Sequence, residues 1–266
     1  MRRAILIPLV LLCCFGCSEL ESVESEPKRA DDRINPAELE SFLTIIDSLP
    51  DRRLPSLPPV MPNASQWGRS RTLPVNELVK EEERSLAGRI SIERFAGHFP
   101  QSRFLKRALR REKITIEQFV GLYLALGLSV SRTHVPADRD LDQIVARGKR
   151  AIIELKKDQR LFSSLPDDEG YFLKEQSGWL AVVDRATHLR QVHHANVDLV
   201  QRHRARLEGV LPAEFSQNPF LEFGTILDDR GIPFQEPPGQ ESDDHISWSR
   251  DQAFVGTDPA AADEGQ

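Results

Sequence analysis

Cysteine is absent from the chain beyond residue 17, because the only cysteines of the 266-residue sequence are Cys13, Cys14 and Cys17. A disulfide, a cysteine-ligated metal site and a cysteine nucleophile are therefore excluded from residues 18–266. A domain in that part of the chain must be held together by core packing alone.

Short catalytic and cofactor motifs are also lacking. The sequence contains no G-x-S-x-G, no Walker phosphate loop, no G-x-G-x-x-G, no H-E-x-x-H and no C-x-x-C-H. We therefore predict no catalytic residue and no cofactor. Because many enzymes carry no short signature, a cell-wall-modifying hydrolase stays open as an alternative function.

The first segment of the chain has a basic start, an apolar run and a small residue near its end. Arg2 and Arg3 precede the uncharged run 4–15, which also contains Pro8. Twelve residues make a helix of about 18 Å, well short of the roughly 30 Å hydrocarbon core of a bilayer. This pattern is typical of a signal peptide, here residues 1–16.

The end of that run, Cys14-Phe15-Gly16-Cys17, resembles the lipobox of bacterial lipoproteins. The resemblance implies lipid attachment at Cys17, cleavage after Gly16, and an exported protein anchored to a bacterial membrane, facing the periplasm or the exterior. More than one acyl chain makes such anchoring stable. Ser18 in the next position favours the outer membrane by the same resemblance. The alternatives are an ordinary cleaved signal peptide and a retained anchor.

Charge is distributed unevenly along the chain. Residues 18–35 carry six acidic and three basic residues, residues 228–266 carry ten and two, and the middle carries slightly more bases than acids. We therefore predict a disordered acidic tether over 17–35 and a disordered acidic tail over 235–266. Acidic ends repel phosphates, so we predict no nucleic-acid partner.

The middle of the chain, residues 36–234, predicts an all-α fold, an irregular helical bundle. Apolar residues recur at helical spacing, and capping residues mark helix starts at Asn35, Thr115 and Asp140. A proline-rich connector over 50–75 and an apolar C-terminal strap over 212–234 complete the domain. The predicted helices cover residues 36–49, 74–86, 91–99, 101–111, 115–130, 140–165 and 171–207, the last with a possible break at 177–178.

Two of these predicted helices have unusual surfaces. Residues 119–130 are apolar all round, which indicates a helix buried on every side, and Tyr123 within it needs a hydrogen-bond partner. The helix over 101–111 instead repeats bases at spacings of three and four. This basic face is either solvated and paired with nearby acids, or a docking patch for an anionic ligand, an acidic partner or the chain's own tail. Its residues are Arg103, Lys106, Arg107, Arg110 and Arg111, with Lys113 just beyond.

The helix over 171–207 carries four histidines. Two i,i+4 pairs, Asp184 with His188 and His194 with Asp198, could each offer two metal ligands from one face. His188 and His193 point about 140° apart on a helix with 3.6 residues per turn, so one ion cannot collect every candidate. The candidate metal ligands are His188, His193, His194 and Asp198.

The preferred interpretation of these histidines is structural. His193, Asn196 and His203 fall on the predicted inward stripe, so we predict buried, neutral, hydrogen-bonded imidazoles at 193 and 203. The sequence as a whole predicts a lipid-anchored envelope protein that binds other envelope proteins or cell-wall material without catalysis. A metal- or haem-binding helical protein and the wall hydrolase are the alternatives.

Overall fold

The computed structural model describes residues 26–55, 57–60, 72–99 and 102–228. Helices make up the regular structure of these residues, whose β structure is one isolated bridge between Pro74 and Leu161. The all-α prediction is confirmed. The predicted signal peptide, the lipid attachment at Cys17, the tail over 235–266 and connector residues 61–71 lie outside the described residues.

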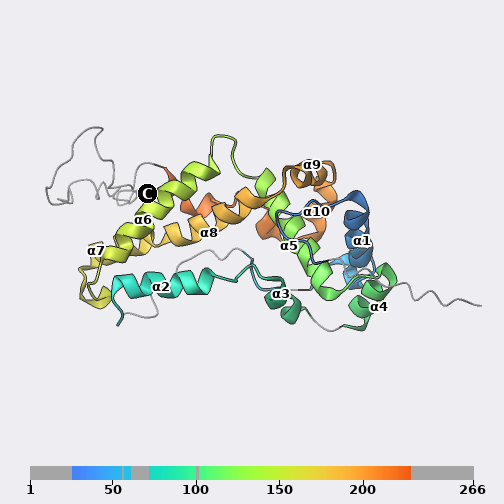
Figure 1. Cartoon of the computed structure of the whole chain (residues 1–266), viewed down its shortest axis with the longest axis horizontal. Helices are drawn as coiled ribbons and strands as arrows, with labels where there is room; N and C mark the ends of the chain where they lie inside the picture. The colour runs from blue at the N-terminus through green and yellow to red at the C-terminus, as the bar shows by residue number, and fades with distance from the viewer. Residues whose placement is uncertain (1–25, 56, 61–71, 100–101, 229–266) are drawn as a thin grey trace, which may run out of the picture.

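Helix α5 (Ile116–Thr133) is the centre of one half of the molecule (Figure 1). Every residue from 119 to 131 is buried, which confirms the prediction from its apolar sequence. Its start is set by the predicted capping box, in which Thr115 and Gln118 each bond the other's backbone N–H. Around it pack α1 (Pro36–Asp47), α3 (Ile92–His98), α9 (His194–Arg202) and the 3-10 turn η3 (Ala213–Ser216).

Aromatic rings fill the space around α5. Phe119 stacks on Phe42 of α1 with ring centroids 5.2 Å apart and meets Phe99 edge-on at 5.6 Å. Tyr123 lies edge-on to Phe215 of η3 at 5.7 Å. Gly127 allows Phe215 to approach, since a Cβ at this glycine would lie 2.5 Å from the ring. We call α1, α3, α5, α9 and η3 the aromatic half.

A second group of helices forms the other end of the molecule, which we call the amphipathic half (Figure 1). Helices α6 (Leu141–Lys157) and α8 (Gly178–Gln191) pack along each other, and α2 (Val75–Leu86) packs against both. The short helix α7 (Asp167–Gln176) leads into α8. Helices α2 and α6 each have an aliphatic inner face and a charged outer face, whereas α8 is buried over most of its length and includes Trp179. The two halves join where α8 contacts α5.

Helix α6 ends at Lys157, eight residues before the predicted end at 165. The chain beyond it becomes extended and bonds the segment that enters α2. Val75 N–H donates to Arg160 O at 3.0 Å, and Asn76 N–H donates to Asp158 O at 2.9 Å. Phe162 and Leu165 have the spacing of the apolar stripe, so the predicted helix was extended to them although the chain leaves the helix before they are reached. Phe162 begins the 3-10 turn η2 (Phe162–Ser164).

The predicted helix over 171–207 is four helices, so that prediction was wrong in its continuity. The chain breaks between α7 and α8 at Ser177, as anticipated, and again at Val192–His193 and at His203. The last break separates α9 from α10 (Arg204–Val210). At the middle break, His193 N–H donates to Ala30 O at 3.2 Å instead of continuing the helix. A partner distant in sequence therefore replaces the intrahelical bond.

Residues 26–35 are packed against the bundle, which contradicts the predicted disorder for this part of the tether. Ile34 is 3% exposed. The Asn196 side chain accepts from Ile34 N–H at 2.8 Å and donates to Asp32 O at 2.9 Å. Gly121 allows the backbone of Lys28 to lie directly against α5, since a Cβ at this glycine would lie 2.6 Å from Lys28 O. Composition averages over the segment and does not register these individual contacts.

The remaining short elements follow the predicted boundaries closely. Asn35 caps α1 through a capping box with Glu38, and Ser102 caps α4 (Arg103–Glu112). The 3-10 turn η1 (Pro50–Arg52) begins the connector. The described part of the C-terminal strap contains η3, η4 (Leu221–Phe223) and α11 (Gly224–Leu227), whose phenylalanines are buried.

Candidate functional site

The four histidines between the middle of α8 and the start of α10 do not form one cluster. His188 Nε2 lies 3.5 Å from Asp184 Oδ1, as the i,i+4 spacing predicted. The rings of His193 and His194 stack at 4.6 Å. Across the described residues, no three histidine, cysteine, aspartate or glutamate side chains converge on a point where they could hold a metal ion.

The prediction of buried neutral histidines was wrong. His193 and His203 are only half-buried. His193 lies at the start of α9, where its Nδ1 accepts from Ala195 N–H at 3.1 Å, and His203 lies in the break before α10. The break in the helix at residue 192 turns His193 away from the stripe to which a continuous helix would assign it. Asn196, the third polar residue of that stripe, is fully buried and binds the N-terminal segment.

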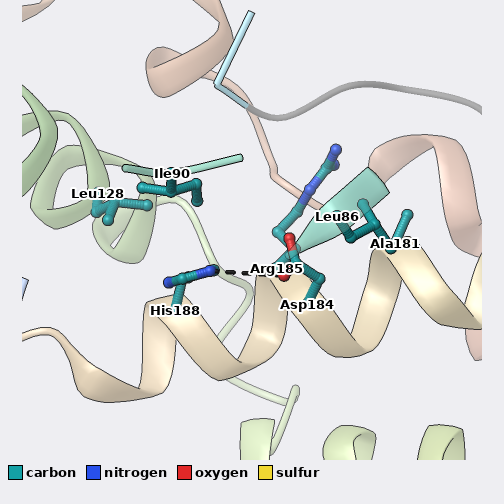
Figure 2. A pocket seen from close by; sticks show the side chains of 7 residues that line it. All are labelled: Leu86, Ile90, Leu128, Ala181, Asp184, Arg185 and His188. Carbon is teal, nitrogen blue, oxygen red and sulfur yellow. Dashed lines mark ion pairs between the residues drawn. The ribbon is translucent and has the colours of Figure 1, made fainter. Parts of the chain in front are cut away.

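A small hollow lies beside the Asp184–His188 pair (Figure 2). Its volume of about 10 Å³ is room for one water molecule. Leu86, Ile90 and Leu128 close its other sides. In Figure 2 the Arg185 side chain runs away from the imidazole of His188, toward the strap. This hollow is too small to hold an organic ligand.

Arg185 is the most buried arginine of the described chain, with 7% of its surface exposed. One guanidinium nitrogen donates to Pro219 O of the strap, and the guanidinium lies 5.1 Å from the ring centroid of Phe223. Burial lowers the pKa of Arg185, while the negative charges of Glu222, Glu214 and Asp184 act in the opposite direction. An arginine begins far above pH 7 and stays charged here. Arg185 therefore ties α8 to the strap with a buried positive charge.

A larger hollow opens on the other side of Arg185, between α8 and the strap. Its volume is about 80 Å³. We call it the Arg185 crevice, and its lining residues are Arg185, Glu214, Gln217, Asn218, Pro219, Leu221 and Glu222. Leu221 lies at its rim with 70% of its surface exposed. The crevice thus combines a cation, two carboxylates, two amides and an exposed apolar side chain.

The sequence held one sign of this crevice that we did not interpret. Arg185 stands between Val182 and Ala186 on the inward stripe of α8, where a charged residue is unexpected unless it has partners. The partners come from the strap, more than thirty residues later. The position alone could have marked Arg185 as a residue of interest, but not its partners.

Tyr123 shows a different departure from expectation. Its ring is fully buried in the aromatic half, and its hydroxyl has no hydrogen-bond partner among the described residues. The expected partner is therefore missing from this part of the chain. Burial raises the pKa of the Tyr123 phenol above its ordinary value, and the negative charge of Glu214 adds to the effect. Glu214 itself accepts from Val60 N–H at 3.0 Å.

No family model, no curated protein and no solved structure matches this chain. Within the described residues, no single helix is long and apolar enough to cross a membrane. The bent pair α4–α5 passes that test by length and composition together, but residues 119–131 of α5 are buried inside the protein.

Proposed function

We propose that this protein is a lipid-anchored, non-enzymatic binding module of the bacterial cell envelope, exported and attached through Cys17. The Arg185 crevice is its recognition site for peptide segments. The observation that carries the binding role is the buried guanidinium of Arg185 at the base of a crevice with an exposed leucine at its rim. The lipid attachment is supported by the lipobox resemblance at residues 14–17.

The chemistry of the crevice favours peptides over other ligands. Gln217 and Asn218 offer amide groups that match a peptide backbone. The positive charge of Arg185, which is bonded to Pro219 O, attracts a carboxylate toward the base of the crevice. Glu214 and Glu222 suit an amino group. Leu221 provides an apolar contact of the kind that contributes most to small interfaces. Protein segments and the peptides of the cell wall share this combination of groups.

The experiment uses the chain from Ser18 to Gln266, which lacks the signal segment and the lipid. Binding is measured by sedimentation with purified peptidoglycan sacculi, and separately with sacculi whose peptides have been removed by an amidase. The variant L221A/E222Q alters the rim of the crevice at two exposed positions. We expect it to weaken binding about tenfold, the effect of losing about 1.4 kcal/mol of contact.

The control is I153A/E154Q on α6, which likewise removes one aliphatic side chain and one negative charge at adjacent positions. Glu154 pairs with Lys157 at 2.7 Å, an exposed ion pair whose loss costs little stability. Ile153 is 54% exposed and lies outside the crevice. Binding that drops equally in both variants, or persists on peptide-free sacculi, contradicts recognition of wall peptides by the crevice. A pull-down of envelope proteins by the lipidated chain tests protein segments as the other source, and a version cut after Phe234 shows whether the tail contributes.

A further inference from the structure

The outer side of α4 carries a continuous basic surface. The helix turns its apolar residues Leu105, Ala108 and Leu109 inward, where they are buried. The four bases on the opposite side are exposed and recur at spacings of one, three and four, so they lie together. We call this surface the α4 basic face, and its residues are Arg103, Lys106, Arg107 and Arg110.

The α4 basic face differs from the other basic surfaces of this end of the molecule in lacking acidic partners. Lys106, Arg107 and Arg110 form no ion pair with any carboxylate of the described residues. Arg111, one position further, is bonded to Ser48 Oγ at 2.5 Å and pairs with Glu112 at 3.3 Å. The expectation that nearby acids neutralise this helix therefore holds at Arg111 and fails on the basic face.

An apolar side chain accompanies these charges. Phe104 is 43% exposed, and the Arg103 guanidinium lies 5.0 Å from its ring centroid. Where protein helices meet the head-group region of a bilayer, lysine and arginine side chains attract anionic head groups and Phe or Trp rings enter the acyl boundary. On a membrane, the bases of α4 would attract anionic lipids and the exposed Phe104 ring would reach the acyl boundary.

The chain enters the folded domain at the same end of the molecule as α4. The Lys28 backbone lies against Gly121, in the second turn of α5, and the Lys28 ammonium pairs with Glu38 of α1 at 3.2 Å. Helix α4 packs on α1 and is joined to the start of α5 by residues 113–115. Figure 1 shows α1, α4 and the beginning of α5 together at this end.

The contacts of residues 26–35 shorten the distance over which the domain can move from its anchor. Eight residues, 18–25, lie between Cys17 and Glu26, and the nine steps from one to the other span at most about 32 Å when fully extended. Lys28 is held by its backbone contact and Ile34 by Asn196, so the tether is effectively the chain before residue 26. A lipidated Cys17 would keep this end of the domain close to the bilayer.

From these observations we infer that the α4 basic face, with Phe104, docks on anionic phospholipid head groups of the membrane to which the protein is anchored. This inference rests on the anchoring part of the proposed function and adds the orientation of the domain. None of the residues of the α4 basic face lines the Arg185 crevice, so both surfaces can be occupied by different partners. Each lysine or arginine near an anionic surface adds to the attraction, which falls with salt.

The test measures flotation of the chain from Ser18 to Gln266 with vesicles of phosphatidylcholine alone or mixed with phosphatidylglycerol. Because this chain lacks Cys17, the flotation result does not depend on lipidation. Lipidation is tested separately, by measuring the mass of the amino-terminal peptide of the protein isolated from cells. The three glutamates between Ser18 and Glu26 remain in this chain, so their competition with the lipid is included. The variant K106E/R107E reverses the centre of the face.

The matched control is K149E/R150E, an adjacent lysine–arginine pair exposed on α6 and likewise without an acidic partner among the described residues. We expect the wild-type chain to bind the vesicles that contain phosphatidylglycerol. Binding should be at least tenfold weaker for K106E/R107E and near wild type for K149E/R150E, and F104A should bind with an intermediate affinity. Equal loss in both pairs would show attraction by overall charge and overturn the inference. If the wild-type chain does not bind the vesicles, the inference is overturned. This holds even if a chain ending at Phe234 does bind, because that result would mean that the acidic tail, and not lipid, occupies the α4 basic face.

Discussion

The aromatic half and the amphipathic half solve the same packing problem with different residues. In the aromatic half, α5 is buried on every side and rings from Phe42, Phe99 and Phe215 fill the gaps around it. In the amphipathic half, α2 and α6 each bury an aliphatic face and expose a charged one, and they pack against α8, which is buried over most of its length. Ion pairs such as Lys156–Glu83, at 2.7 Å, connect the outer surfaces there.

This difference indicates where the stability of the domain resides. A central helix surrounded by large rings concentrates buried apolar area, so single changes there cost the most. Exposed ion pairs contribute little each and are weakened by salt. The polar Arg185 crevice lies where α8 of the amphipathic half meets the strap whose Phe215 anchors the aromatic half. The proposed recognition site thus lies at the junction of the two halves.

The largest effect is expected at the anchor of the strap. Phe215→Ala removes a fully buried ring that contacts Tyr123 and fills the space above Gly127. We expect the free energy of unfolding to fall by about 3–5 kcal/mol, measured by urea denaturation. Leu221→Ala, in the same strap but 70% exposed, should change it by less than about 0.5 kcal/mol. Equal costs would contradict the assignment of the core to Phe215.

Tyr123→Phe should give a smaller effect of opposite sign. The variant removes a buried hydroxyl without a partner in the described chain, so we expect the free energy of unfolding to rise by about 1 kcal/mol. The other tyrosine, Tyr171, is 73% exposed, and Tyr171→Phe is the matched control with no expected change. A destabilised Tyr123→Phe would mean that the hydroxyl has a partner.

The same residue predicts a pH dependence. Burial raises the pKa of Tyr123 in the folded state, so the folded state favours the neutral phenol. The free energy of unfolding is therefore unaffected by this group below the ordinary tyrosine pKa, about 10, and falls as the pH rises above that value. The unfolded chain ionises first and is favoured. Between about pH 10 and 12, the stability of Tyr123→Phe should therefore decline less steeply than that of the wild type, while Tyr171→Phe follows the wild type.

The smallest effect is expected in the amphipathic half. A double-mutant cycle on Glu83→Ala and Lys156→Ala isolates an ion pair whose side chains are 39% and 40% exposed. We expect a coupling of about 0.2–1 kcal/mol at low salt, and most of it should disappear at 1 M salt. A coupling above about 2 kcal/mol, or one that salt does not change, would contradict the view that the exposed ion pairs of this half contribute little to stability.

Much of the fold could be predicted because helix formation is local. Residues Asn35, Thr115 and Asp140 each bond backbone N–H groups two or three positions later, so the starts of α1, α5 and α6 were predictable. The burial of α5 followed from its composition. The candidate site was not predictable in the same way, since Arg185 and Pro219 meet only after the strap folds back.

The sequence by itself determined the helices, their caps and the central place of α5, since spacing and composition act over a few residues. It also carries the lipobox resemblance, which rests on residues 14–17 alone and does not depend on the folded domain. Only the tertiary structure decided where α6 ends, that the chain breaks at His193, that residues 26–35 lie against Asn196 and Gly121, and that Arg185 lines a crevice. In each of these the partner lies far along the chain, and its hydrogen bond or contact replaces the local one.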